Sequence, residues 1–196
     1  MKEVNISIAV LAIATMLTAC GGNDGAASAA KASSGAGCNL VSTIDESTLN
    51  IKVAAGDSDA AKEFLKTCNN PYNKIFANDP VKLKKLGKRA YNYNNCTGCH
   101  GGKLGGVMAP GLRKQPQGGQ SQWDNKWIYA KNATDKGMFE TIAGGTPGKS
   151  QKGNMFKWHK QIPGHTGDGL TTDEILQVVA FIRTKYEGTD GKTWLE

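Results

Sequence analysis

Apolar and polar positions alternate with the period of a helix in three stretches of this chain, which indicates an all-α fold. The first stretch is residues 79–93, where Asp79 and Pro80 are typical of a helix start and lysines lie among the apolar positions. Gly87 lies in the middle of this stretch, at a propensity cost of about 1 kcal/mol. We expect the missing side chain to let another helix cross closely there, with Tyr91 packed beside the crossing.

Two further helices are expected in the second half of the chain. Thr134-Asp135 is a capping pair for a short helix over residues 136–143. The final helix begins at Thr171, whose spacing to Glu174 is that of a capping box, and we expect it to end at Gly188. Its apolar residues repeat at i, i+3, i+4 and i+7, which predicts one buried face. We expect this C-terminal helix to be the one that crosses the first helix near Gly87.

Residues 38–78 have a weaker pattern and predict an N-terminal extension, a small cap or wrapping arm without chemistry of its own. Residues 49–53 alternate apolar and polar side chains, which predicts a short strand. A short helix is expected over residues 57–66, and the turn residues 69–72 end it.

The N-terminus has the pattern of an export signal. Residues 6–19 form an apolar run that is short for a transmembrane helix and fits the hydrophobic region of a secretory signal. The run ends in Leu17-Thr18-Ala19-Cys20, the form of a bacterial lipobox, so we expect Cys20 to be acylated after cleavage. An ordinary signal cut after Ala19, which leaves Cys20 as a thiol, is the alternative.

These patterns divide the chain into a lipoprotein signal peptide (1–19), a tether (20–37), the extension (38–78) and a main domain (79–196). Residues 21–37 are rich in Gly, Ala and Ser, and a flexible segment of that length reaches on the order of 20–25 Å. The expected location is therefore the periplasm, with the protein anchored to a membrane by its lipid.

Charge and composition narrow the class of partner only a little. The formal net charge of +7 suggests an acidic partner or an anionic surface, although solubility alone also explains it. No nucleic-acid-binding motif accompanies the basic charge, so no nucleic-acid partner is expected. Aromatic residues make up 7% of the chain, and a large bound apolar group would help so modest a core to pack.

The main chemical signal is Cys96-Thr97-Gly98-Cys99-His100, the C-x-x-C-H attachment sequence of a c-type haem. In such a box the two thiols add to the two vinyl groups of the porphyrin, and the adjacent histidine becomes the proximal iron ligand. A thioredoxin-like site would be expected in a βαβ context, and it does not require a histidine directly after the second cysteine. A zinc site would need a second ligand pair at suitable spacing, which the sequence lacks.

The five cysteines can all be assigned under this interpretation. Cys96 and Cys99 are assigned to one covalent haem c, and Cys20 to the lipid. Cys38 and Cys68 remain as a pair in an exported, oxidising location, so we predict a disulfide between them.

The sixth iron ligand is expected well after His100, and Met155 in a Gly-rich loop is the first candidate. Met108 follows His100 too soon, and Met138 fits a core position of a helix better. His159 or His165 would give bis-histidine iron, and an open sixth position is a further alternative. A thioether ligand would raise the reduction potential and close the iron to catalysis. Aromatic candidates to pack on the haem are Trp123, Trp127, Tyr129 and Trp158.

The span from about residue 79 to 195 resembles cytochrome cL, the electron acceptor of pyrroloquinoline-quinone (PQQ) methanol dehydrogenases in methylotrophic bacteria. Besides the haem box, the resemblance rests on an ordered set of short motifs. They are Pro110-Gly111-Leu112, Trp127-x-Tyr129, Asn132-x-Thr134-Asp135-x-Gly137, Phe139-x-Thr141-Ile142-x-Gly144-Gly145, Met155, Leu170-Thr171-x-Asp173-Glu174, Ile182-Arg183-x-x-Tyr186-x-Gly188 and Trp194-Leu195.

The resemblance implies a class I cytochrome c fold with an N-terminal extension and an electron-transfer protein rather than an enzyme. It implies that the Pro110 carbonyl accepts the ring N–H of His100. It also implies a PQQ-dependent methanol dehydrogenase as electron donor, with the lanthanide-dependent branch as one candidate, and a downstream c-type cytochrome or oxidase as acceptor. A set of lysines is expected to ring the exposed haem edge: Lys103, Lys149, Lys152, Lys157 and Lys160.

Two other classes of function stay open at this point. One is a membrane-tethered electron donor to an oxidase or reductase unrelated to methanol. The other is a haem enzyme or gas sensor with an open iron position, which binding of carbon monoxide without ligand displacement would indicate.

Overall fold

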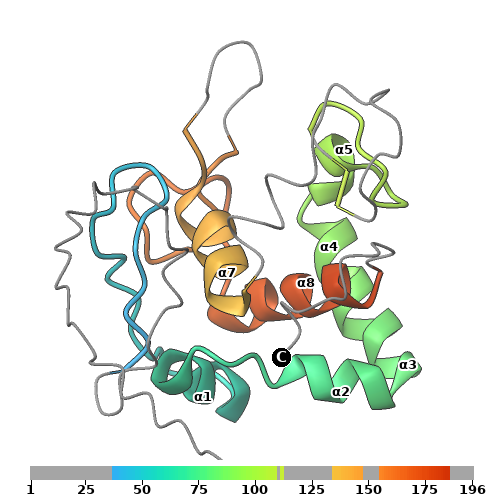
Figure 1. Ribbon diagram of the computed structural model, residues 1–196, viewed down its shortest axis with the longest axis horizontal. Helices are drawn as coiled ribbons and strands as arrows, with labels where there is room; N and C mark the ends of the chain where they lie inside the picture. The colour runs from blue at the N-terminus through green and yellow to red at the C-terminus, as the bar shows by residue number, and fades with distance from the viewer. Residues whose placement is uncertain (1–36, 110, 113–133, 148–154, 186–196) are drawn as a thin grey trace, which may run out of the picture. The chain divides into compact units, whose positions relative to one another are not determined.

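Helix α8 (Thr172–Thr184) lies at the centre of the part of the chain that the structure describes (Figure 1). The computed structural model describes residues 37–109, 111–112, 134–147 and 155–185, all within the compact unit 35–196. Most side chains of α8 are buried, and it contacts α1, α2, the helix that precedes the haem box, and α7. The capping box of Thr171 and Glu174 is present, as the sequence predicts.

The helix before the haem box begins where the sequence predicts, but it is not uniform. It runs as α3 (Pro80–Lys82), the π-helical segment η1 (Leu83–Lys88) and α4 (Arg89–Tyr93). The Asp79 side chain accepts a hydrogen bond from the Lys82 backbone N–H at 2.9 Å, which confirms it as the N-cap. The wide turn of η1 was not predicted, because no local sequence signal marks such an insertion.

The crossing at Gly87 is confirmed. A Cβ at Gly87 would lie 3.1 Å from Cβ of Phe181 and 3.3 Å from the carbonyl oxygen of Gln177, both on α8. The Tyr91 ring packs beside the crossing, 5.3 Å from the ring of Phe181. The same Cβ would also lie 2.7 Å from the Phe76 ring of the extension, so a third element meets the two helices there.

Two short helices complete the main part. α5 (Cys96–His100) is the haem box itself, and α7 (Asp135–Gly144) begins at the predicted cap, where the Thr134 side chain accepts from the Gly137 N–H. In Figure 1, α4 and α5 lie above one half of α8 and α7 lies above the other half. The observed elements agree with the all-α, class I cytochrome c fold.

The extension folds as α1 (Asp59–Thr67) and α2 (Tyr72–Asn78), preceded by irregular chain. The disulfide between Cys38 and Cys68 is present, as predicted. Buried side chains of the extension belong to the same hydrophobic core as those of α7 and α8: Leu40, Leu49, Phe64, Tyr72 and Phe76. The extension therefore helps to build the core.

Three carboxylates of α7 and α8 hold the extension by hydrogen bonds. Asp135 accepts from the backbone N–H of Asn70 and the side chain of Asn73, and it pairs with Nε of Arg183 at 2.7 Å. Asp173 accepts from the N–H and hydroxyl of Ser58 and from the Tyr72 hydroxyl. Glu140, 6% exposed, accepts from the Val41 N–H at 2.7 Å. Hydrogen bonds to charged acceptors are the stronger kind.

Some expectations for individual elements were wrong. Residues 49–53 form no strand; the described residues contain two isolated β-bridges, Val41–Thr48 and His159–Leu170, and no longer ladder. The expected turn at residues 69–72 leads directly into α2, which was missed. α8 ends at Thr184 rather than at Gly188. No helix within the described part of the chain has the length and apolar character needed to cross a membrane.

Candidate haem site

The two cysteines of the haem box lie on one short helix. In α5 they are three residues apart, so both thiols lie on the same side of one helical turn. Among the described cysteines, Cys96 and Cys99 are those outside the disulfide, and both are partly buried. Asn95 has a left-handed backbone (φ 61°) and separates α5 from α4, so the helix does not run straight into the box as expected.

The loop after the box folds back onto it. The carbonyl oxygen of Cys99 accepts hydrogen bonds from three successive backbone N–H groups at 3.0–3.1 Å, those of residues 107–109. The His100 carbonyl accepts from the Gly106 N–H at 2.9 Å, and the buried Tyr91 hydroxyl donates to the Gly101 carbonyl at 2.9 Å. The backbone around the proximal candidate His100 is therefore held by contacts close in sequence.

Burial controls the titration of this part of the site. It raises the pKa of the Cys96 thiol to about 11, with a smaller contribution from the neighbouring Cys99. The pKa of Tyr91 is also raised, chiefly by burial and then by the two thiols. Both groups are therefore neutral at ordinary pH, before any haem is attached to the thiol.

Met155, the predicted distal ligand, is the first residue of the described stretch 155–185, which follows α7 in the chain. Its backbone is paired with Thr146: the Thr146 N–H donates to the Met155 carbonyl at 3.0 Å, and the Met155 N–H donates to the Thr146 hydroxyl at 3.2 Å. Its side chain is partly buried and packs against the hydrophobic core. Thr146 was missed from the sequence, because a lone threonine after a glycine pair carries no pattern.

The two alternative histidines differ in availability. His159 is fully buried; its Nδ1 accepts from the Gln161 N–H at 3.1 Å, so Nε2 carries the proton and donates to the Thr172 hydroxyl at 3.1 Å. Burial lowers the pKa of His159 to about 4. With both ring nitrogens engaged, this residue has no lone pair to offer iron. His165 Nδ1 donates to the Ile162 carbonyl at 3.0 Å, which leaves its Nε2 as an acceptor.

Of the remaining sequence-predicted haem contacts, the structure describes Trp158. Trp158 is partly buried against the core, and its backbone N–H donates to the carbonyls of Ile142 and Ala143 at the end of α7. The other predicted positions lie outside the described residues: Cys20, Pro110, Trp123, Trp127, Tyr129, Lys149 and Lys152.

Comparison with known proteins agrees with this geometry. Residues 85–185, from the π-helical segment to the end of α8, match the sequence profile of the cytochrome c family. The chain belongs to the cytochrome c family. Membership means one covalently bound haem c, and the box of α5 supplies the two thiols that such a group requires.

Individual relatives make the family assignment more specific. The chain is 34% identical to cytochrome c-L of Methylorubrum extorquens over 137 residues, which is 70% of this chain and 55% of the relative. The chain thus spans about half the length of that curated relative. This cytochrome c is therefore similar to cytochrome cL in sequence.

Two solved structures support the same conclusion. Cytochrome cL from Methylophaga aminisulfidivorans has a TM-score of 0.58 at 28% identity, over 81% of this chain and 87% of that one. Cytochrome cL from Hyphomicrobium denitrificans has a TM-score of 0.56 at 28% identity, over 79% and 77%. The predicted resemblance to cytochrome cL is confirmed.

The described residues fit the haem that the family requires. The thiols of Cys96 and Cys99 share one side of a helical turn, and His100 follows them on the same helix. Cys96 and Met155 are both partly buried against the hydrophobic core, and Met155 offers a thioether in the second half of the fold. Thiols, an imidazole and a thioether are the donor set of a His/Met c-type cytochrome.

Proposed function

We propose that the protein is an electron carrier that accepts electrons one at a time from a PQQ-dependent methanol dehydrogenase and passes them to a downstream c-type cytochrome or oxidase. The observation that carries this proposal is the similarity to cytochrome cL in both sequence and structure, together with an intact haem box. Two encounters remove the two electrons that one alcohol oxidation releases.

Each site residue has a proposed role. Cys96 and Cys99 attach the haem, His100 is the proximal ligand and Met155 the distal ligand. When bound, the haem supplies a one-electron iron centre, and a thioether ligand favours its reduced form. The chain's own contribution is to hold these donors and exclude water, which the folded-back loop after the box supports.

Further haem contacts are proposed for Pro110, Trp127 and Trp158. The Pro110 carbonyl would orient the His100 ring, and Trp127 and Trp158 would pack on the haem. Trp158 already packs against the core close to α7, which supports its part of this proposal.

The proposed location is the periplasmic side of a membrane. Haem c assembly takes place outside the cytoplasm, and the Cys38–Cys68 disulfide fits an oxidising compartment. In this proposal residues 1–19 are removed, Cys20 carries the lipid, residues 20–37 are the tether, residues 38–78 are the extension and residues 79–196 form the cytochrome c domain. The lipid then keeps the carrier near its partners.

Docking is proposed to use basic side chains near the haem box or the Met155 loop in sequence, together with apolar side chains beside the box. Lys103 and Lys160 are exposed and Lys157 is partly exposed, which leaves their charge available to an acidic partner. Two exposed apolar side chains also lie beside the box: Tyr93 is 83% exposed just before it, and Met108 is 67% exposed just after it. A small apolar contact with a charged rim suits a transient encounter.

Rapid mixing tests the proposal directly. Oxidised protein is mixed with methanol dehydrogenase and methanol, and reduction is followed by the visible absorption of the cytochrome. We expect saturable, fast reduction that slows steeply as salt is added, because salt screens the docking charges. The control donor is a PQQ dehydrogenase specific for another alcohol or sugar.

Equal rates with both donors would support the generic membrane-tethered carrier instead of a methanol-specific one. Fast reduction that does not change with salt would retain the function but exclude electrostatic docking. Carbon monoxide binding to the reduced protein without loss of a ligand would favour the sensor or enzyme class.

A further inference from the structure

The N-terminal extension reaches the segment that leads to Met155. The hydroxyl of Thr43 donates to the carbonyl of Gly145 at 2.5 Å, a contact between residues 102 positions apart. Gly145 is the C-cap of α7 and has a left-handed backbone (φ 75°). A side chain outside the cytochrome c family match thus fixes the peptide at which the chain leaves α7.

The two glycines at the end of α7 face different neighbours. A Cβ on Gly144 would lie 3.4 Å from both methyl carbons of Leu49, which is buried in the extension. A Cβ on Gly145 would lie 2.5 Å from the carbonyl oxygen of Met155 and 3.1 Å from the carbonyl carbon of Phe156. The pair is therefore packed between the extension on one side and the backbone of Met155 on the other.

The next residue completes the connection. Thr146 both donates its N–H to the Met155 carbonyl and accepts the Met155 N–H on its hydroxyl. These reciprocal bonds fix both backbone polar groups of Met155. A continuous chain of contacts therefore runs from Thr43 through Gly145 and Thr146 to Met155.

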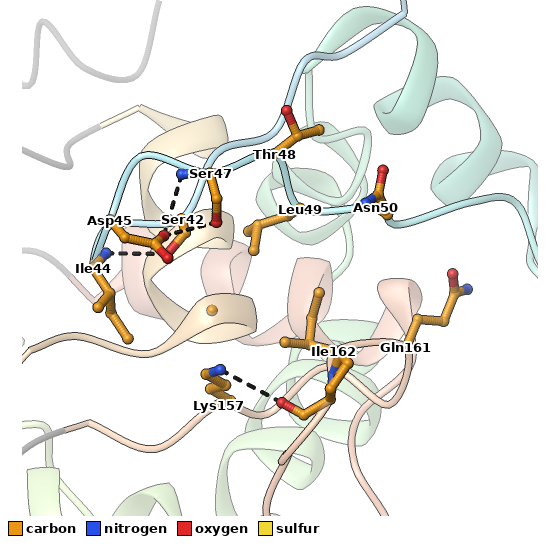
Figure 2. Close-up of a pocket in the computed structure, with 12 residues that line it drawn as sticks. Ser42, Ile44, Asp45, Ser47, Thr48, Leu49, Asn50, Lys157, Gln161 and Ile162 are labelled. Carbon is orange, nitrogen blue, oxygen red and sulfur yellow. Dashed lines mark hydrogen bonds between the residues drawn. The ribbon is translucent and has the colours of Figure 1, made fainter.

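A second hydrogen-bonded contact joins the extension to the loop after Met155, and a cleft lies between these two segments. The cleft has a volume of about 240 Å³, and Figure 2 shows residues 42–50 on one wall and Gln161 and Ile162 on the other. The side-chain amide of Gln161 accepts the Lys52 N–H at 2.9 Å and donates to the Lys52 carbonyl at 2.8 Å. The extension therefore contacts the end of α7 through Thr43 and the loop after Met155 through Lys52.

We propose that the extension positions the Met155 loop, with Thr43 and Thr146 as positioning residues that keep the thioether in place for the iron. This inference rests on Met155 as the distal ligand, which is part of the proposed function. Neither threonine acts as an iron ligand in this proposal: Thr146 bonds the Met155 backbone directly, and Thr43 acts on it through the Gly145 carbonyl. The extension then influences the stability of the iron–sulfur bond, and through it the reduction potential.

The test uses the full-length haem-loaded protein and needs no dehydrogenase. The variants are Thr43→Val, which removes the hydroxyl at nearly constant volume, and Thr43→Ser, which keeps it. Thr48→Val is the matched control, because Thr48 is an exposed threonine on the wall of the same cleft. The readouts are the near-red sulfur-to-iron band of the oxidised protein, the rate at which added imidazole displaces the methionine, and the reduction potential.

Loss of one hydrogen bond of ordinary strength changes an equilibrium by about fivefold. We therefore expect imidazole to bind roughly fivefold faster and tighter in Thr43→Val, with a weaker band and a lower potential. Thr43→Ser and Thr48→Val should match the wild type. A mere loss of global stability would leave imidazole exchange unchanged under native conditions, and that result would overturn the inference.

The combination with Thr146→Val shows whether the two residues act in one path. If Thr43 acts through the Gly145–Thr146 segment, its effect on imidazole exchange should shrink well below fivefold once residue 146 has no hydroxyl to accept the Met155 N–H. Independent, multiplicative effects would contradict that path. A wild type without the near-red band would overturn both this inference and the assignment of Met155 as distal ligand. Failure to react with methanol dehydrogenase would overturn only the proposed identity of the electron donor.

Discussion

The two segments that are proposed to supply the iron ligands are held in different ways. The proximal segment, residues 89–112, carries the haem box, and the hydrogen bonds described around it join residues near in sequence, such as those to the Cys99 carbonyl. The distal segment, residues 134–147 and 155–170, is tied to the extension by partners about 100 positions away, such as Thr43 and Lys52. Attachment is thus encoded locally, whereas the distal ligand depends on tertiary structure.

This difference has a physical reason. A covalent attachment at two cysteines keeps the proximal segment at the haem whatever the rest of the chain does. A thioether is a weak, exchangeable ligand, so its loop must be ordered by contacts that offset the entropy of holding it. The reciprocal bonds between Thr146 and Met155 are the last link of that support.

The largest expected effect is on attachment. Replacing Cys96 and Cys99 together by alanine should leave no haem on the protein after denaturing electrophoresis, as measured by haem staining. The matched control replaces Cys38 and Cys68, whose disulfide spans a sequence separation of 30. That variant should keep its stain but lose about 3–4 kcal/mol of unfolding free energy. Haem stain that remains after Cys96 and Cys99 are replaced would contradict the attachment site. Loss of stain in the Cys38/Cys68 variant as well would show that attachment also depends on the disulfide.

The sequence predicted the proximal side well because its signals are local. The haem box, the Asp79 cap and the glycine at the helix crossing each appear within a few adjacent residues, and the structure confirms the cap and the crossing. The Thr171–Glu174 capping box was equally visible. Attachment of haem at Cys96 and Cys99 remains a prediction that the staining experiment checks.

The distal side was predicted less completely. The disulfide followed from counting cysteines, but α2 of the extension and the carboxylate contacts of Asp135 and Asp173 had no local signature. On the proximal side, the π-helical segment had none either. Residues 49–53 alternate like a strand, yet no neighbouring strand is present among the described residues to pair with them. Partners 65 and 115 positions apart, such as Asn70 with Asp135 and Ser58 with Asp173, are set by the fold and not by spacing along the chain.

The next largest effect is expected at Gly145. Gly145→Ala would combine a left-handed backbone with a Cβ 2.5 Å from the Met155 carbonyl oxygen. We therefore expect the free energy of unfolding to fall by about 2–4 kcal/mol. Gly56→Ala is the control, because Gly56 also has a positive φ (97°) but nothing lies within 4 Å of its Cβ position. It should cost about 1 kcal/mol. Chemical denaturation measures both, and equal losses would show that the Met155 contact is unimportant.

The pH dependence of stability should report on His159 in the distal segment. Burial holds its pKa at about 4 in the folded protein, against 6.5 ordinarily, so the unfolded chain takes up the proton first. The contribution of neutral His159 to the free energy of unfolding is fully present above pH 6.5, and it falls by about 3 kcal/mol as the pH drops to 4. Denaturation from pH 4 to 8 should show this decline in the wild type and in His165→Gln but not in His159→Gln. An unchanged decline in His159→Gln would contradict it.

A smaller effect is expected at the helix crossing on the proximal side. Gly87→Ala inserts a Cβ 3.1 Å from Phe181 and 2.7 Å from the Phe76 ring. Overpacking opposes the gain in helix propensity, so the net loss should be about 1–2 kcal/mol with the haem spectrum unchanged. Gly102→Ala has nothing within 4 Å of its Cβ position and should be neutral. A change of axial ligation in Gly87→Ala would contradict the claim that the distal ligand is held separately from the proximal segment.

The central claim is that a ligand held by the distal segment completes the iron site. It is tested most directly by the optical spectrum of the oxidised protein, wild type beside Met155→Ala. Met138→Ala is the control, because Met138 is buried in α7 and 5% exposed. We predict a weak near-red sulfur-to-iron band in the wild type and in Met138→Ala that disappears in Met155→Ala. A band that survives in Met155→Ala, or a wild type without one, would contradict the account.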